Sequence, residues 1–357
     1  MRSVARTFAL DRGIDAWLQE IEPAWSLGSL RARVVGVVTE THDTKTFVLE
    51  PNGHWPGHLA GQFVPVEVDV GGVRTVRCYS LSSSPSEPRL RLTVKRVPSG
   101  RVSGFLHDHV RYGDVLRLGA PAGDFVLPTP RPAKLLLVSG GSGVTPIMSI
   151  LRSLVASENV GDVVFVHAAR SASDVLFRSE LEELALRFPE LRLMFFLDDA
   201  ESGRLDPTKL RQAVPDLAER HTMLCGPQGM MDGLAPIWAE TGLGSRLQME
   251  RFALPARAVR AEGAEGAEGA TPTKVRVTLL RSGRTATTEG EGTLLEALEQ
   301  AGETPAHGCR MGICNTCLCR KKSGVVTNVA TGAVSSEPDE DIRLCTSRAE
   351  SDLELVL

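Results

Sequence analysis

The chain has 357 residues, of which 42% are hydrophobic and 24% are charged, and its formal net charge is -4. This composition is typical of a globular protein with two or three domains, and it gives no reason to expect a nucleic-acid partner. No apolar run approaches the roughly 20 residues that span a bilayer, and Asp11 and Arg12 interrupt the apolar stretch near the N-terminus, so we predict a cytoplasmic location.

Residues 1–30 are predicted to form a helical N-terminal extension. Trp17, Leu18 and Ile21 recur there at helical spacing. Such a face either packs on the domain that follows or presents a docking surface, and we favour packing.

Residues 31–130 contain short β-type runs separated by Gly, Pro and Asp, which predicts an antiparallel β-barrel. Three short motifs lie within this segment: Arg77-Cys78-Tyr79-Ser80, Lys95-Arg96-Val97 and Gly100-Arg101-Val102-Ser103. The third precedes an expected helix, whose free N-terminal amides would suit a phosphate group. Taken singly, the first motif is better explained as an arginine and a tyrosine that pair on the barrel surface.

Residues 131–253 alternate apolar strands with helices, which predicts a parallel sheet in an α/β domain. A glycine-rich loop, Ser139-Gly140-Gly141-Ser142-Gly143-Val144-Thr145-Pro146, follows the first strand. Gly141 and Gly143 permit the close approach of a pyrophosphate to the backbone. We expect Thr145 to cap the next helix and Pro146 to begin it. Because a proline replaces the third glycine, the generic dinucleotide fingerprint is matched poorly.

Two further motifs lie near the ends of strands in the same segment, Cys225-Gly226-Pro227 and Met249-Glu250-Arg251-Phe252. Cys225 is either a nicotinamide-site residue, which we favour, or a buried structural cysteine. After the second strand stand Arg170, Ser171 and Arg178, which could accept a coenzyme 2'-phosphate. Asp174 lies among them, and both arginines could equally be solvated, so the choice between NADPH and NADH stays open with NADPH preferred.

Residues 254–273 are predicted to be a flexible linker, because three Ala-Glu-Gly repeats give glycine every third residue and no large apolar side chain. Residues 274–357 then form a separate module with an initial strand, a turn at Ser282-Gly283 and a helix capped by Thr293.

Four cysteines of this module, Cys309, Cys314, Cys317 and Cys345, have the C-x4-C-x2-C spacing with a distant fourth cysteine that is typical of a plant-type [2Fe-2S] cluster. Zinc is the competing metal, but a structural zinc site usually has two short cysteine pairs, whereas only one such pair is present here. A [2Fe-2S] cluster passes single electrons, so the sequence indicates an electron carrier. Cys319 has no assigned role.

Together these motifs resemble the ferredoxin-NADP reductase superfamily, followed by a plant-type ferredoxin domain of the α+β β-grasp fold. The resemblance implies that Arg77 pairs with a flavin phosphate, Tyr79 lies against the isoalloxazine, and Ser80 hydrogen-bonds near flavin N5. It implies that Gly100 and Ser103 hold the flavin pyrophosphate and that FAD is favoured over FMN. The other cofactor positions that it implies are Lys95, Val97, Gly141, Gly143, Thr145, Pro146, Arg170, Ser171, Arg178, Gly226 and Pro227. Ser80, Cys225 and Glu250 are the implied catalytic residues.

The domain order resembles single-chain reductases that pass electrons from NAD(P)H, through a flavin and a [2Fe-2S] cluster, to oxygenases, hydroxylases or fatty acyl desaturases. The histidines give no set of boxes for a di-iron centre, so we expect a separate protein to carry the oxygen chemistry; a membrane-bound partner would be met at the membrane surface. A self-contained NAD(P)H oxidoreductase of a small molecule is the rival hypothesis, and a redox-sensing regulator ranks last. Basic residues near the cluster are either a docking surface or a solvated turn: Arg310, Arg320, Lys321 and Lys322.

Overall fold

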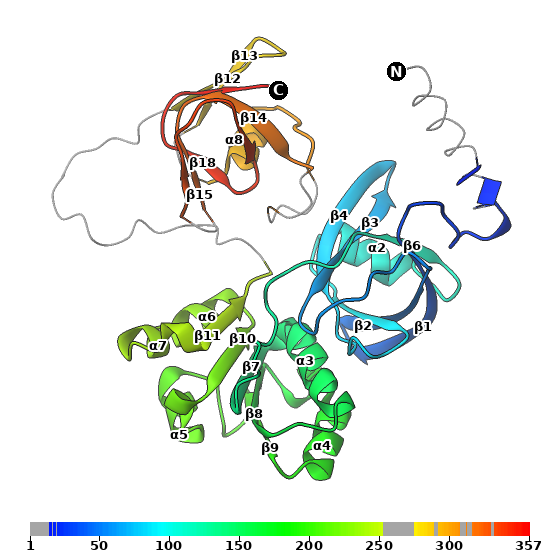
Figure 1. Ribbon diagram of the computed structural model, residues 1–357, viewed down its shortest axis with the longest axis vertical. Helices are drawn as coiled ribbons and strands as arrows, with labels where there is room; N and C mark the ends of the chain where they lie inside the picture. Colours follow the sequence, from blue (N-terminus) through cyan, green and yellow to red (C-terminus); the bar gives the residue numbers. More distant parts are fainter. Residues whose placement is uncertain are drawn as a thin grey trace. The chain divides into compact units, whose positions relative to one another are not determined.

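The computed structural model describes residues 14–15, 17–18, 20–252, 275–288, 292–307, 312, 316–329 and 332–357. It divides into two compact units, Met1–Arg251 and Phe252–Leu357 (Figure 1). The predicted linker, residues 254–273, lies outside the described residues, as do Cys309, Arg310 and Cys314.

The first unit begins with an antiparallel six-stranded sheet in the order β4-β3-β6-β1-β2-β5. Its strands are β1 (Arg31–Thr41), β2 (Thr44–Pro51), β3 (Phe63–Val70), β4 (Val73–Ser80), β5 (Leu90–Lys95) and β6 (Val115–Leu118). A bridge between Leu81 and Leu92 connects the end of β4 to β5 and so joins the two edges of the sheet. The antiparallel barrel is therefore confirmed.

Alternating apolar residues fill the barrel, because successive side chains of a strand point to opposite faces. Val64 and Val66 of β3 are fully buried, as are Phe47 and Leu49 of β2. Helix α2 (Arg101–His109) adds Leu106 to the same core.

The N-terminal segment is helical at residues 14, 15, 17, 18, 20 and 21. The prediction that this helix packs on the barrel is wrong for two of its three residues, because Trp17 is 61% exposed and Ile21 is 55% exposed. The attachment comes instead from the residues that follow: Arg33 pairs with Glu22, and Asn52 Nδ2 donates to Ala24 O at 3.2 Å.

The second part of the first unit is a parallel five-stranded sheet in the order β11-β10-β7-β8-β9, as predicted. Its strands are β7 (Lys134–Gly140), β8 (Asp162–Ala169), β9 (Leu191–Leu197), β10 (His221–Cys225) and β11 (Leu247–Glu250). The helices are α3 (Val144–Ala156), α4 (Arg178–Arg187), α5 (Pro207–Ala213), α6 (Gln228–Leu234) and α7 (Pro236–Glu240). Short 3-10 turns are η1 (Gly141–Gly143), η2 (Ala172–Asp174), η3 (Leu217–Glu219) and η4 (Gly244–Arg246).

Helices cover both faces of this sheet, which is why its strands are continuously apolar (Figure 1). Leu135 and Leu137 face the core that contains α3 and α4 residues, whereas Leu136 and Val138 face the core that contains residues of α5, α6 and α7. None of the helices in the described part of the chain is long and apolar enough to cross a lipid bilayer.

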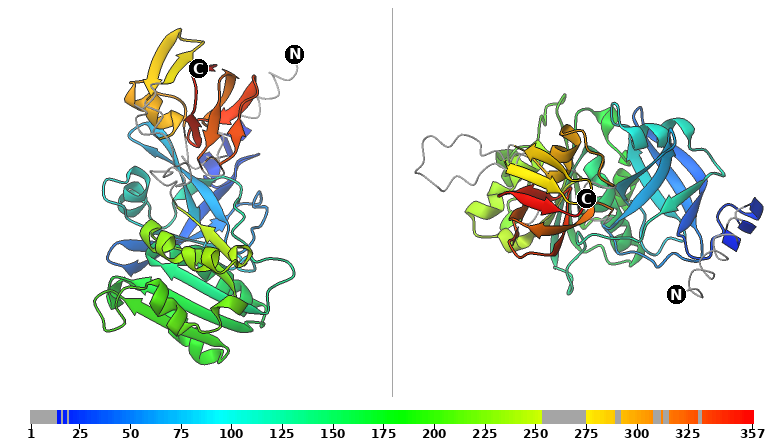
Figure 2. Two further views of the ribbon diagram at one scale, coloured as in Figure 1. Left: turned by 90° about the vertical axis from the view of Figure 1, so that its left-hand side faces the viewer. Right: turned by 90° about the horizontal axis from the view of Figure 1, so that it is seen from above.

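The second unit has the predicted β-grasp architecture, and Figure 2 shows its strands, yellow to red, from two further directions. Its main sheet has the order β13-β12-β19-β14-β17, and β12 and β19 pair in parallel. The elements are β12 (Val275–Leu279), β13 (Arg284–Thr288), α8 (Leu294–Gln300), β14 (Leu318–Ser323), β15 (Val326–Asn328), β16 (Val334–Ser335), β17 (Glu340–Arg343), β18 (Ser347–Ala349) and β19 (Leu353–Leu355). Thr293 caps α8 as predicted and forms a capping box with Glu296.

Lys321 of β14 is completely buried, so for this residue both predictions, a docking surface and a solvated turn, are wrong. Its ammonium group donates to the carbonyl oxygens of Gly324 at 2.9 Å, Ser335 at 3.2 Å and Glu337 at 2.7 Å. Lys321 therefore fixes the loop between β16 and β17. The flanking basic residues, Arg320 and Lys322, are exposed and pair with aspartates.

Candidate functional site

The N-terminus of α2 forms a compact loop that suits a phosphate group. Gly104 N–H bonds to Gly100 O at 2.8 Å, so the amides of residues 101–103, which precede it, have no carbonyl of an earlier helical turn to bond. Ser103 Oγ accepts a hydrogen bond from Val97 N–H at 3.2 Å, and a Cβ added to Gly100 would lie 2.5 Å from this oxygen. The structure thus brings Val97, Gly100 and Ser103 together and leaves little room for a side chain at position 100.

The Arg77-Cys78-Tyr79-Ser80 motif forms the end of β4. Tyr79 packs against the barrel core, and burial raises the pKa of Tyr79 above its ordinary value of 10, so the phenol stays protonated. Ser80 is buried, and Arg77 Nη1 donates to Val76 O at 2.8 Å. Lys95, at the end of β5, forms an ion pair with Asp43 at 3.2 Å. A neutral aromatic ring next to a buried hydroxyl suits the uncharged ring system of a flavin.

The glycine loop packs directly against the Cys225-Gly226-Pro227 motif. A Cβ on Gly143 would lie 2.3 Å from Cys225 O, and one on Gly226 would lie 2.4 Å from Met230 Cε. Gly143 cannot accept a side chain without backbone movement, and Gly226 can accept one only if the end of the Met230 side chain moves. Gly141 has open space around it, but its φ of +50° favours glycine. The close approach that the sequence predicted for a ligand is therefore also an approach between two loops of the protein.

The predicted cap of the next helix is wrong by two residues. Helix α3 begins at Val144, with Gly143 at the N-cap, because η1 already turns the chain. Thr145 lies inside the first turn, where its hydroxyl donates to Ser142 O at 3.0 Å. Pro146 also lies in the first turn, where its missing N–H costs nothing. The N-terminal amides of α3 still follow the glycine loop directly, which is the arrangement that a pyrophosphate site requires.

A row of polar side chains crosses the sheet next to this loop. Cys225 is in register with Glu250 on one side and with Ser139 on the other, and Ser139 is in register with His167. In-register residues of parallel strands project to the same face. Ser139 Oγ lies 2.8 Å from His167 Nδ1. Neither Ser139 nor His167 was among the predicted site residues, although a polar residue in an otherwise apolar strand is a signal for such a position.

Two groups in this row have shifted pKa values. Burial, and then the nearby Glu250, raise the pKa of Cys225 well above its ordinary value, so it remains a neutral thiol. Burial, and then Asp124, raise the pKa of Glu250 from 4.5 to about 7. Glu250 can therefore take up or release a proton near neutral pH, which agrees with a role in a redox site.

Two of the three candidate 2'-phosphate residues share an acidic partner. Arg170 Nε and Nη2 each donate to the Asp174 carboxylate at 3.1 Å, and Ser171 Oγ donates to the same carboxylate at 3.2 Å. Arg178 pairs separately with Glu182 at 2.8 Å. A 2'-phosphate would therefore have to compete with Asp174 for Arg170.

Two of the four predicted cluster ligands are described, and they lie together. Cys317 Sγ and Cys345 Sγ are 3.2 Å apart, too far for a disulfide of about 2.05 Å but close enough to bind one iron ion. Gly312 N–H donates to Cys345 Sγ at 3.2 Å, and a Cβ on Gly312 would lie 2.7 Å from Thr346 Cγ2. This sulfur pair with an amide donor fits a [2Fe-2S] cluster.

Other described side chains add no metal site. Burial raises the pKa of Cys319 to about 11, so this thiol stays protonated. The prediction that the histidines contain no H-x3-H spacing is wrong for His54 and His58. In the structure, however, His54 Nε2 contacts Ser26 O and His58 Nε2 contacts Ser83 O. Within the described ranges, no three His, Cys, Asp or Glu residues gather around a common point.

Family models match all three parts of the chain in order. Residues 31–127 match an oxidoreductase FAD-binding domain, residues 137–235 an oxidoreductase NAD-binding domain, and residues 277–350 a 2Fe-2S iron-sulfur cluster binding domain. An NADPH oxidoreductase of Mycobacterium tuberculosis is 38% identical and covers 99% of this chain and 90% of its own length. The chain belongs to the ferredoxin-NADP reductase superfamily.

Two further relatives align with nearly the whole of this chain. The glycine betaine monooxygenase reductase subunit of Chromohalobacter salexigens is 33% identical over 92% of this chain and 95% of its own. The structure of phthalate dioxygenase reductase has a TM-score of 0.62 and 26% identity, and covers 92% of this chain and 98% of its own. The chain is thus an NAD(P)H-dependent oxidoreductase with FAD and [2Fe-2S] cofactors, as the sequence indicated.

Proposed function

We propose that this reductase passes electrons from NAD(P)H, through FAD and the [2Fe-2S] cluster, to a separate oxygenase. The packing of Gly143 against Cys225, with Glu250 next to Cys225, carries the proposal, because it joins the coenzyme loop to the residues expected at the nicotinamide. A bound flavin can accept two electrons from NAD(P)H and release them singly, which is the form that a [2Fe-2S] cluster carries.

The side chains of the protein would serve this transfer in different ways. The neutral thiol of Cys225 and the neutral phenol of Tyr79 add no charge where the coenzyme and flavin rings would meet. Glu250 supplies a proton acceptor and donor at neutral pH. Arg77 and the N-terminal amides of α2 offer positive charge for the flavin phosphates.

The proposed acceptor follows the names of relatives. A reductase subunit of glycine betaine monooxygenase and a ferredoxin reductase component of 3-ketosteroid-9-alpha-monooxygenase are 33% and 32% identical to this chain. An oxygenase is therefore the preferred acceptor class. A hydroxylase or a fatty acyl desaturase, contact with a membrane-bound partner and a cytoplasmic location stay predictions of the sequence.

Substitution of one cysteine ligand of the cluster distinguishes the role of the flavin from the role of the cluster. We expect Cys314→Ser to remove one cluster ligand and leave flavin reduction intact, so the variant should still reduce ferricyanide with NAD(P)H but lose reduction of cytochrome c and of an oxygenase partner. Cys319→Ser is the matched control, because Cys319 is a protonated thiol in the same unit. Unchanged partner-dependent turnover in Cys314→Ser would contradict the cluster as the exit and favour a self-contained oxidoreductase.

A further inference from the structure

We propose that Ser149 and Arg152 are positioning residues for hydride transfer: they attach helix α3, which begins at the coenzyme loop, to the segment that follows the flavin motif. The inference rests on the proposed function, since it concerns the distance between coenzyme and flavin. Neither residue was singled out by the sequence motifs.

Helix α3 has the coenzyme loop at one end. It starts at Val144, directly after Gly143, so any displacement of α3 moves the amides expected to hold the coenzyme. With a rise of about 1.5 Å per residue, Ser149 lies about 8 Å and Arg152 about 12 Å further along the helix axis. Both side chains are buried.

Ser149 joins α3 to two backbone groups of the barrel segment. Its hydroxyl donates to Ser83 O at 2.7 Å and accepts from Gly61 N–H at 3.4 Å. Gly61 itself has no room for a side chain, because its Cβ would lie 2.0 Å from Phe125 O. Helix and barrel therefore meet here through backbone groups that have little freedom to move.

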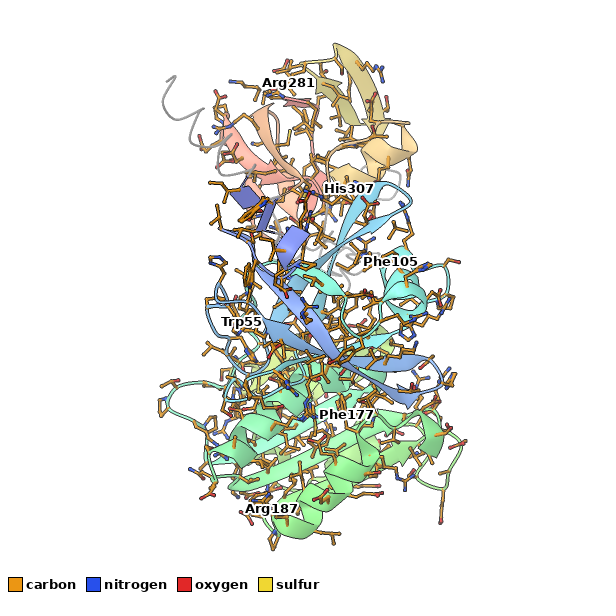
Figure 3. The ribbon with its side chains drawn as sticks, turned by 90° about the vertical axis from the view of Figure 1, so that its right-hand side faces the viewer. Trp55, Phe105, Phe177, Arg187, Arg281 and His307 are labelled. Atoms are coloured by element: carbon orange, nitrogen blue, oxygen red, sulfur yellow. The ribbon has the colours of Figure 1, made fainter. Side chains whose placement is uncertain are left out.

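Arg152 makes a second attachment one turn further on. Its side chain is 7% exposed, and Nη1 donates to Ser82 O. Nε and Nη2 donate to the Glu180 carboxylate of α4 at 2.7 and 2.6 Å, which balances the buried charge. The guanidinium group lies 4.8 Å from the centre of the Phe177 ring, which Figure 3 labels.

The two carbonyl groups that accept these bonds belong to a firmly held segment. Ser82 N–H bonds to Arg91 O at 2.9 Å, and Ser83 Oγ accepts from Arg91 N–H at 3.1 Å. Ser82 stands two residues after Ser80 and three after Tyr79. The position of α3 is thus transmitted to the flavin motif through two residues of extended chain.

Hydride transfer is sensitive to this geometry, because reacting atoms must approach to about 3–3.5 Å and a misplacement of 1 Å can cost about 100-fold in rate. Loosening the attachments should therefore slow the transfer itself more than it weakens coenzyme binding. A residue that only stabilises the fold would have no such selective effect.

The variants Ser149→Ala and Arg152→Lys test the proposal against Ser157→Ala and Arg211→Gln. Ser157 lies at the end of the same helix, but its hydroxyl donates to Leu154 O within that helix, and Arg211 is an exposed arginine paired with Glu240. In anaerobic stopped-flow reduction of the bound flavin, we expect the limiting rate to fall about 10- to 100-fold in the first two variants, with the dissociation constant of NAD(P)H changed less than about threefold. The absorbance of the charge-transfer complex between reduced flavin and NAD(P)+ should fall in parallel.

Hydrogen exchange on the oxidised, flavin-loaded protein, without added NAD(P)H, tests the attachment without turnover. Faster exchange is expected in the first turn of α3 and at residues 80–83 together in Ser149→Ala and Arg152→Lys, and in neither region in the controls. Lower thermal stability with an unchanged limiting rate would overturn the proposal, and so would unchanged exchange at residues 80–83. If NAD(P)H failed to reduce the flavin of the unmodified protein, the proposed function would fail, whereas the exchange result would still decide the attachment.

Discussion

Glu250→Gln should remove a pH dependence from both the stability and the activity of the reductase. Burial and Asp124 raise the pKa of Glu250 from 4.5 to about 7. Between these values the folded state binds more protons than the unfolded state, so the free energy of unfolding falls as the pH rises. Each pKa unit corresponds to about 1.4 kcal/mol, which makes the full effect about 3 kcal/mol.

The measurement compares the flavin-free protein with its Glu250→Gln variant, because a bound flavin would change the surroundings of the carboxyl group. Urea unfolding followed by tryptophan fluorescence suits this purpose, since Trp238 is completely buried beside the sheet. The difference in unfolding free energy between the two proteins should change by about 3 kcal/mol from about pH 4 to about pH 8. Glu240→Gln, at an exposed helix end, should leave the pH dependence unaltered.

Activity gives a second reading of the same group. In the complete enzyme, flavin reduction by NAD(P)H should show an inflection that depends on Glu250 and is absent in Glu250→Gln. A constant stability difference over the whole pH range would refute the assigned pKa. A shared inflection in both proteins would show that another group titrates.

Lys321→Met should lower the unfolding free energy of the ferredoxin unit by about 3 kcal/mol or more, because three carbonyl groups lose a buried charged donor. The same substitution of the exposed Lys322 should lower it by less than about 1 kcal/mol. Urea unfolding followed through cluster absorbance compares the two variants, and equal effects would contradict a structural role of Lys321. Gly143→Ala should weaken NAD(P)H binding at least about tenfold, because the new Cβ displaces the loop from Cys225. Titration of flavin reduction with NAD(P)H measures the binding, and unaltered binding would refute the close contact. His167→Gln should make the fold less sensitive to acid. Burial lowers the pKa of His167 from 6.5 to about 4, so the unmodified protein loses stability as the pH falls between these values and the unfolded state takes up the proton first. Acid unfolding curves of the variant and the unmodified protein that coincide would count against this.

The sequence predicted the strands of the parallel sheet well because both faces are covered, so each strand is an unbroken apolar run. It could not predict that Cys225 lies beside Glu250, since this contact depends on the register between two strands that α6 and α7 separate in the chain. Thr145 was misassigned as the cap because a 3-10 turn at η1 starts the helix earlier than threonine and proline preferences indicate.

Lys321 shows where local reasoning fails and what could have corrected it. A run of basic residues indicates surface charge, but this run lies on a strand, and successive residues of a strand face opposite sides. The burial of β14 follows that alternation, with Lys321 inside and both neighbours outside. Gly324 follows β14 directly, but the other two acceptors, Ser335 of β16 and Glu337 of the loop after it, could be known only from the tertiary structure.

The sheet order of the ferredoxin unit also sets the timing of its folding during synthesis. Strand β19, at residues 353–355, lies between β12 and β14 and is the last strand of the unit to be translated. Until it leaves the ribosome, the pairs β12–β13 and β14–β17 have no strand to join them. Because domains generally fold as units while the chain emerges, the FAD and NAD domains can fold first, and the sheet that frames the cluster site is completed after translation of residue 355.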